Sequence, residues 1–147
     1  MQTVTTLAQA MADAIADAVP DIDAVDLNSY LPAVETRRAA LVGVPTGSST
    51  TLTPLTMGGE WEALHRVRLQ LWVKVDTGAA DDSMERARDI GHLALLALAR
   101  ADGDGYALAP EGTPLLSEVG PDILSVAEVP YVLVTLTVTV WETDVIA

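Results

Sequence analysis

Two long stretches in which apolar and polar residues alternate constrain this chain more than any other feature of its sequence. The first runs from about Leu64 to Asp76 and the second from Val132 to Trp141. Aliphatic residues occupy every second position in both, so a β-strand, with its period of two, places them on one face. The alternate positions are polar or basic in the first stretch and rich in threonine in the second. We therefore predict a sheet with one buried face and one solvated face.

The first helix is predicted at Leu7–Val19, where apolar residues recur at helical spacing. Thr5 or Thr6 is expected to cap its start, since a hydroxyl oxygen can accept a hydrogen bond from a free N–H of the first turn. Pro20 is expected to end it. The single apolar stripe of this helix indicates that it docks on the sheet.

A second helix is predicted after residue 82. Asp82 is expected to cap it, because Glu85 follows three positions later as in a capping box. From Ile90 to Ala99 the segment is apolar nearly all round, which indicates that the helix is largely buried. The Asp-Gly-Asp-Gly run at residues 102–105 is expected to end it.

The remaining segments are short or rich in loop-forming residues. Residues 21–36 are predicted to form a loop with room for one short strand, and residues 39–44 a buried strand. Residues 46–60 are rich in Gly, Ser, Thr and Pro, which leaves two alternatives, a hairpin arm or a mobile loop, and we favour the arm. Residues 123–129 are predicted to be a strand, whereas residues 106–121 give no clear signal.

Together these elements predict a single α+β domain that spans residues 1–147. Its mainly antiparallel sheet has two helices packed on one face and a projecting arm or hairpin. A chain of 147 residues is long enough to bury a core without disulfides, and this one has no cysteine. Its sequence contains no internal repeat.

Charge separates the two ends of the chain from its middle. The net charge is −13, which repels nucleic-acid phosphates and anionic membranes. All the basic residues lie between Arg37 and Arg100, and the segments 1–36 and 101–147 carry only acids. The alternatives are a surface that keeps the protein soluble and a neutral middle that contacts neighbouring subunits. No signal peptide is expected, and the longest apolar run, Leu93–Ala99, is far shorter than the about 20 residues that cross a bilayer.

No catalytic, cofactor-binding or metal-binding residue is predicted. His92 follows Asp89 by three positions, but no third ligand has a matching signature. His65 falls among the apolar positions of the long strand, where packing at the sheet edge is the simplest interpretation. No serine lies in a nucleophile elbow, and the glycines form no dinucleotide or phosphate loop. The sequence therefore indicates a protein that is not an enzyme and holds no cofactor.

Two groups of residues are predicted to contact other subunits. The first lies on the polar face of the long strand: Arg66, Arg68, Trp72 and Lys74. The second lies on the arm: Thr50, Thr51 and Thr53. The basic face suits an acidic protein partner, and the arm is expected to become ordered against a neighbour. The alternatives are a solvated face with local ion pairs and a disordered loop.

The order and the lengths of these elements resemble those of the tail terminator, or tail-completion, proteins of long-tailed bacteriophages. The parts that carry the resemblance are the helix Leu7–Val19, the apolar strand ending at Pro45, the polar arm, the alternating strand His65–Val75, the helix from Ser83 and the closing strand Tyr131–Trp141. The resemblance covers most of the chain.

The resemblance implies a structural virion protein that assembles as a hexameric ring. Such a ring caps the last ring of the tail-tube protein, stops tube growth and offers a surface to the head–tail connector proteins, while DNA passes through the lumen without specific binding. It also implies a place in the virion, at the head–tail junction, after assembly in the host cytoplasm and with no membrane partner. Two alternatives stay open: another neck or head–tail joining component, and a small α+β enzyme or ligand-binding domain.

Overall fold

The computed structural model describes residues 3–27, 31–32, 38–43, 48–75, 80–101, 116–126 and 128–145. The helices in these residues are α1 (Val4–Ala18) and α2 (Ala80–Arg100). The strands are β1 (Ile22–Asp26), β2 (Ala39–Gly43), β3 (Ser49–Pro54), β4 (Glu60–Lys74), β5 (Leu116–Val126) and β6 (Val129–Val145). The predicted α+β class is confirmed.

The six strands form one sheet whose centre is the pair β4 and β6. The strand order is β1-β2-β4-β6-β5, and β3 also pairs with β4. Strands β1 and β2 are parallel, and all the other pairs are antiparallel. The prediction of a mainly antiparallel sheet is therefore confirmed.

Strand β4 is long enough to hold two partners, one after the other, on the same side. Its residues Trp61–Arg66 pair with β3, and its residues Leu69–Val73 pair with β2. Between them, the Arg68 N–H donates a hydrogen bond to Ser48 Oγ over 3.0 Å. On its other side β4 pairs with β6 along its whole length, so the halves of β4 share one rigid neighbour.

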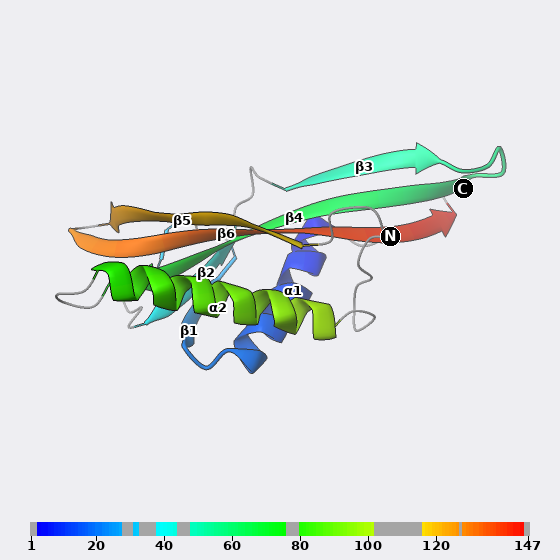
Figure 1. Cartoon of the computed structure of the whole chain (residues 1–147). Coiled ribbons are helices and arrows are strands. Elements are labelled where there is room, and N and C mark those ends of the chain that lie inside the picture. The colour runs from blue at the N-terminus through cyan, green and yellow to red at the C-terminus, as the bar shows by residue number, and fades with distance from the viewer. Residues whose placement is uncertain are drawn as a thin grey trace.

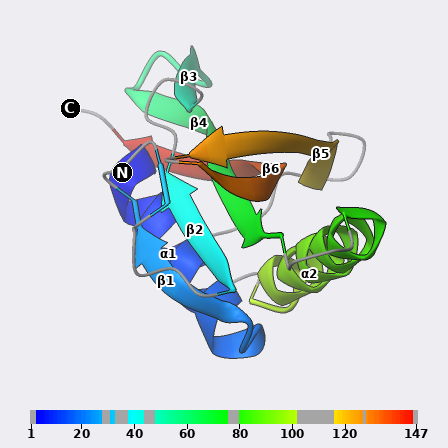
Figure 2. The ribbon, with the colours of Figure 1, turned by 90° about the vertical axis from the view of Figure 1, so that its left-hand side faces the viewer.

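Both helices pack on the same face of the sheet, as predicted (Figure 2). The aliphatic positions of β4 and β6 meet the apolar stripes of α1 and α2 there. The largest fully buried side chains of this core are Leu7, Met11, Ile15, Val19, Val67, Leu69, Leu71, Leu98 and Leu136. Burial of this layer is the main source of stability, since transfer of apolar surface from water contributes about 25 cal/mol per Å².

The sheet extends beyond the helical layer and forms an arm (Figure 1). The arm consists of β3, the turn at residues 55–59, the first half of β4 (residues 60–66) and the last part of β6 (residues 139–145). The hairpin preferred for residues 46–60 is therefore confirmed for residues 49–60, and it has a third strand. Residues 44–47 lie outside the described part of the chain.

The predicted start of each helix was wrong by about one turn or less. Helix α1 begins at Val4, and its cap is Thr3, whose Oγ1 accepts a hydrogen bond from the Thr6 N–H over 3.2 Å. Thr5 and Thr6 are therefore inside the helix. Helix α2 begins at Ala80, so Asp82 lies in its first turn and is not the cap. A carboxylate at this position interacts favourably with the helix dipole. The predicted ends before Pro20 and residue 102 are confirmed.

Two strands differ from their predicted limits. Strand β5 spans Leu116–Val126 where residues 123–129 were expected, and it includes the Gly120-Pro121 pair. Its register to β6 shifts between Val119 and Asp122, which accommodates a proline that has no N–H to donate to the ladder. Strand β6 continues to Val145, beyond the predicted end at Trp141. Residues 21–36 contain the short strand β1, and residues 102–115 lie outside the described part.

Gly43 is required at the end of β2 because the backbone of Leu27 passes directly over it. A Cβ at this position would lie 2.4 Å from the Leu27 carbonyl oxygen. We expect Gly43→Ala to lower the free energy of unfolding by about 1–3 kcal/mol, because the backbone itself must move. Urea denaturation measures this. Gly58→Ala is the matched control, since its Cβ would only touch Thr56 Oγ1 at 3.7 Å, and equal losses in the two variants would contradict the explanation.

Candidate functional site

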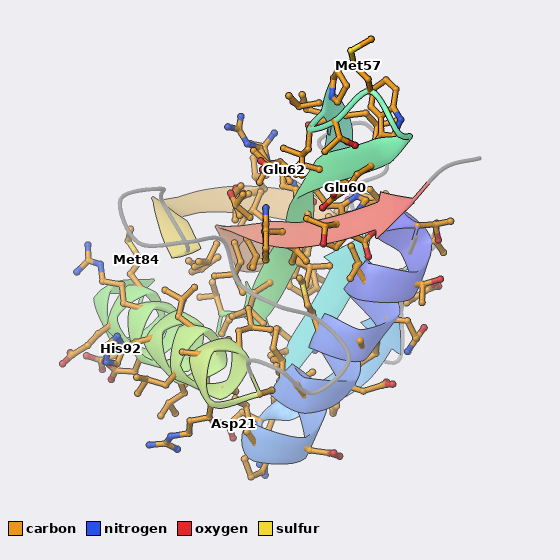
Figure 3. The ribbon with its side chains drawn as sticks, turned by 90° about the vertical axis from the view of Figure 1, so that its right-hand side faces the viewer. Asp21, Met57, Glu60, Glu62, Met84 and His92 are labelled. Carbon is orange, nitrogen blue, oxygen red and sulfur yellow. The ribbon has the colours of Figure 1, made fainter. Side chains whose placement is uncertain are left out.

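The end of the arm is uncharged and partly apolar, although it is surrounded by solvent. Residues 48–59 contain no charged side chain, in a chain where 20% of residues are charged. Every residue of β3 is exposed. Leu52 and Leu55 are 47% and 45% exposed, and Met57 is completely exposed at the tip, at the end away from both helices (Figure 3). Several exposed apolar side chains near the end of a projecting element are typical of a surface that contacts another protein.

Hydrogen bonds define the turn that ends the arm. The Leu55 N–H donates to the Glu60 carbonyl over 2.8 Å, and Thr56 Oγ1 accepts from the backbone N–H groups of Gly58 and Glu60. Gly59 has a φ of 91°, a conformation that a residue without a side chain adopts at little cost. The tip is therefore a formed turn that presents Met57.

His65 ties the three strands of the arm together. It is 1% exposed and lies in the middle of the arm, with β3 on one side of β4 and β6 on the other. Its Nδ1 is 2.9 Å from Thr50 Oγ1 on β3, and its Nε2 is 2.8 Å from Glu142 Oε1 on β6. His65 lies on the predicted, apolar side of the strand. The prediction that it packs at the sheet edge is wrong, because β4 is paired on both sides at this residue. His65 therefore joins β3 to β6 through its two ring nitrogens, at a position inside the sheet.

The face of the sheet opposite the helices, called the open face below, carries the predicted basic stripe. Arg66 is exposed, and Arg68 and Lys74 are partly exposed. Among the described residues, none of the three forms an ion pair, so the local pairing considered above is not present there. Within the described residues these three cations therefore leave their charge available to a partner, in a chain with 21 acids.

Trp72 differs from the other three residues of the stripe because it is 4% exposed. It packs edge-on against Tyr131, with ring centroids 5.9 Å apart, in a small apolar cluster on the open face with Ala40 and Val42. The indole Nε1 has no hydrogen-bond partner in the described part of the chain. Trp72 therefore packs within its own subunit and exposes little surface that a partner could contact.

The structure brings only part of the predicted contact set together. Thr51, Thr53 and Arg66 share the open face of the arm, and Arg68 lies beside the arm on the same face, whereas Thr50 points to the opposite face and bonds His65. Sequence reasoning missed the apolar tip residues Leu52, Leu55 and Met57, and also Glu60 and Glu62, which extend the polar face of β4. The signal that was available is that the polar, uncharged segment 48–59 also contains the large apolar residues Leu52, Leu55 and Met57.

Two classes of site find no support in the described residues. No three His, Cys, Asp or Glu side chains come together there in a way that would hold a metal ion. No helix in that part of the chain is long and apolar enough to cross a membrane. His92 is exposed on α2.

No known protein family matches this sequence, and no curated protein shows significant similarity to it. Any function must therefore be inferred from the surfaces of the fold.

The His65 link can be tested by its effect on β3. His65→Leu keeps a bulky side chain but removes both ring nitrogens, so we expect the free energy of unfolding to fall by about 1–3 kcal/mol. Hydrogen exchange should report a selective loss of protection in β3, because the bond from Thr50 ties β3 to β4 in addition to their backbone pairing. Thr51→Ala, on the exposed face of the same strand, is the control. Unchanged exchange in the His65 variant would show that the link does not hold the arm.

Tyr131 gives the fold a dependence on alkaline pH. Burial raises its pKa above the usual 10.0, and the nearby Asp23 carboxylate raises it further. The folded state therefore favours the neutral phenol, and the unfolded chain ionises first as the pH rises past 10. We expect the free energy of unfolding to fall in that range. The free energy of unfolding of the Tyr131→Phe variant should fall less steeply. Urea denaturation at neutral pH and above pH 10 measures both slopes, and equal slopes would be evidence against this role.

Proposed function

We propose that this chain is a structural subunit that assembles into a ring at the end of a bacteriophage tail tube. In that role it acts as a tail terminator: the ring stops tube polymerisation and provides the surface that joins the tail to the head connector. The observation that carries the proposal is the arm, which projects beyond the helical layer and ends in exposed, uncharged and apolar residues (Figure 1).

A projecting arm suits a closed ring because of symmetry. In a ring each subunit uses two different patches, one for each neighbour, and the rotation must close. An arm that reaches past its own body supplies one patch at a distance from the other. The exposed side of β3 also has backbone groups that can accept a strand or loop from a neighbour.

The charge of the chain supports the same role. DNA has to pass through a terminator ring without being held, and acidic side chains repel phosphates over a distance comparable to the Debye length of about 8 Å. In the end segments of this chain, residues 1–36 and 101–147, every charged residue is acidic. In the proposed ring we place some of these acids at the lumen or the rim, and the basic residues Arg66, Arg68 and Lys74 in contacts between protein subunits.

Two measurements test the assembly and its role. Native mass spectrometry and averaged electron images of the purified chain are expected to give a closed ring of six subunits. The chain is also expected to shorten the tubes formed by the tail-tube protein of the same genome. A ring without any effect on tube length would favour another neck component, and a monomer with a measurable turnover would favour an enzyme.

The apolar tip supplies the specific prediction. Leu55→Asp combined with Met57→Asp should leave the fold unchanged, because both side chains are exposed, and should abolish the ring because charge is placed in a contact that excludes water. Leu93→Asp on α2 is the control, since this leucine is similarly exposed but lies on the helical layer. Native mass spectrometry reads the result, and a ring that survives the double substitution would refute the role of the tip.

A further inference from the structure

The open face of the arm carries a charge pattern that is complementary to itself. Along β4 the residues on this face are Glu60, Glu62, Leu64 and Arg66, and Arg68 follows on the same face directly beside the arm. Two acids precede the leucine and two bases follow it, at equal spacing on each side. Among the described residues, none of these four charged side chains forms an ion pair. Figure 3 shows Glu60 and Glu62 in the arm, above the helical layer.

We infer that two copies of this chain associate face to face through the open face of the arm, about a two-fold axis that passes near Leu64. The two β4 strands then run antiparallel, one above the other. Glu60 of each copy faces Arg68 of the other, Glu62 faces Arg66, and Leu64 faces its own equivalent. This dimer does not depend on the proposed role in a phage tail.

The neighbouring strands fit the same axis. Beside Leu64 lie Thr51 on β3 and Trp141 on β6, so a row that contains two apolar side chains, Leu64 and Trp141, crosses the centre of the face. On either side of this row the flanking positions are small and polar: Ser49, Thr53, Thr139 and Thr143. Rotation about the axis places β3 on β3 and β6 on β6, which stacks Trp141 on its equivalent. Both described helices pack on the opposite face, so they leave this one accessible.

The charges select this orientation over the other one that a flat sheet allows. If the two strands were stacked parallel, Glu60 would face Glu60 and Arg68 would face Arg68, and like charges in contact oppose association. Packed sheets cross at about 30° because of their twist. At about 3.3 Å per residue, the inner charges (Glu62 and Arg66) lie roughly 7 Å from Leu64 and the outer charges (Glu60 and Arg68) roughly 13 Å from it. A crossing of about 30° therefore moves the two members of an outer pair apart sideways by only about 7 Å, which long side chains can span.

The size of the face indicates a weak dimer. Nine residues each of β4 and β6 and the six residues of β3 cover about 400 Å² per copy, which is about half of the roughly 800 Å² that each partner buries in a stable complex. We therefore expect an equilibrium between monomer and dimer that favours the dimer at low ionic strength. About 1 M salt should dissociate it, because the Debye length falls to about 3 Å.

Two charge variants test the pairing by sedimentation at low ionic strength. Glu60→Arg with Glu62→Arg makes the face entirely basic, and Arg66→Glu with Arg68→Glu makes it entirely acidic. Each alone is expected to weaken self-association at least about tenfold, whereas an equimolar mixture should form a heterodimer. Asp13→Arg with Asp17→Arg on α1, and Arg88→Glu with Arg100→Glu on α2, change the net charge equally and should dimerise like the wild type.

A cross-link locates the axis independently of any larger assembly. Because the chain has no cysteine, Leu64→Cys provides a single thiol, which a short bis-maleimide should join to its equivalent in the second copy. Leu93→Cys on α2 is the control and should stay unlinked. A ring contact between unlike patches gives no link between two copies of position 64, so the ring and this dimer can fail separately.

Circular dichroism must show that each variant is folded, and Arg66→Glu alone replaces the acidic double variant if Arg68→Glu unfolds the chain. Absence of a heterodimer in the mixture would overturn the inference. Equal cross-linking at positions 64 and 93 would also overturn it.

Discussion

The antiparallel pairing of β4 with β6 determines the geometry of the whole molecule. It runs without a register shift from Glu60 opposite Val145 to Lys74 opposite Tyr131. In the body of the molecule this register is fixed by the core, because a slip of one residue would turn every aliphatic side chain of β4 to solvent. The strands continue into the arm without interruption. The core therefore also decides which side chains of the arm face which way.

The sequence predicted those elements whose pattern is set by burial. The alternation around Val67–Val75 and Val132–Val140 defined the central strands and the face that the helices cover. It did not define where these strands end, because beyond the helical layer neither face is uniformly apolar. Strand β5 was misplaced because Gly120-Pro121 suggests a loop, whereas a register shift holds the pair within a strand. The cap of α1 was misplaced because three threonines stand close together, and only the position of the first turn distinguishes Thr3 from Thr5 and Thr6.

For the predicted contact residues too, the alternation of apolar and polar residues predicted some properties and missed others. The alternation correctly assigned Arg66 and Arg68 to the face away from the helices, but it gave no reason to separate them from Trp72, which is buried against Tyr131. That burial depends on β2 and β6 lying on either side of β4, a fact of topology and not of local pattern. Likewise, strand alternation places Thr50 on the opposite face from Thr51 and Thr53, but its bond to His65, fifteen residues away in the chain, depends on the pairing of β3 with β4.

The continuity of β4 and β6 between body and arm has a mechanical consequence. No described loop separates the two parts, so the arm cannot swing as a tethered segment does; it bends only as far as the sheet itself bends. Strands carry a right-handed twist that accumulates with length, and the arm thus leaves the body at an angle set by the number of paired residues. In any assembly that the arm makes, the rotation between adjacent subunits would follow from that backbone twist. Insertion or deletion of a residue pair in β4 and β6 would then change the curvature of the assembly while every contact residue stayed the same.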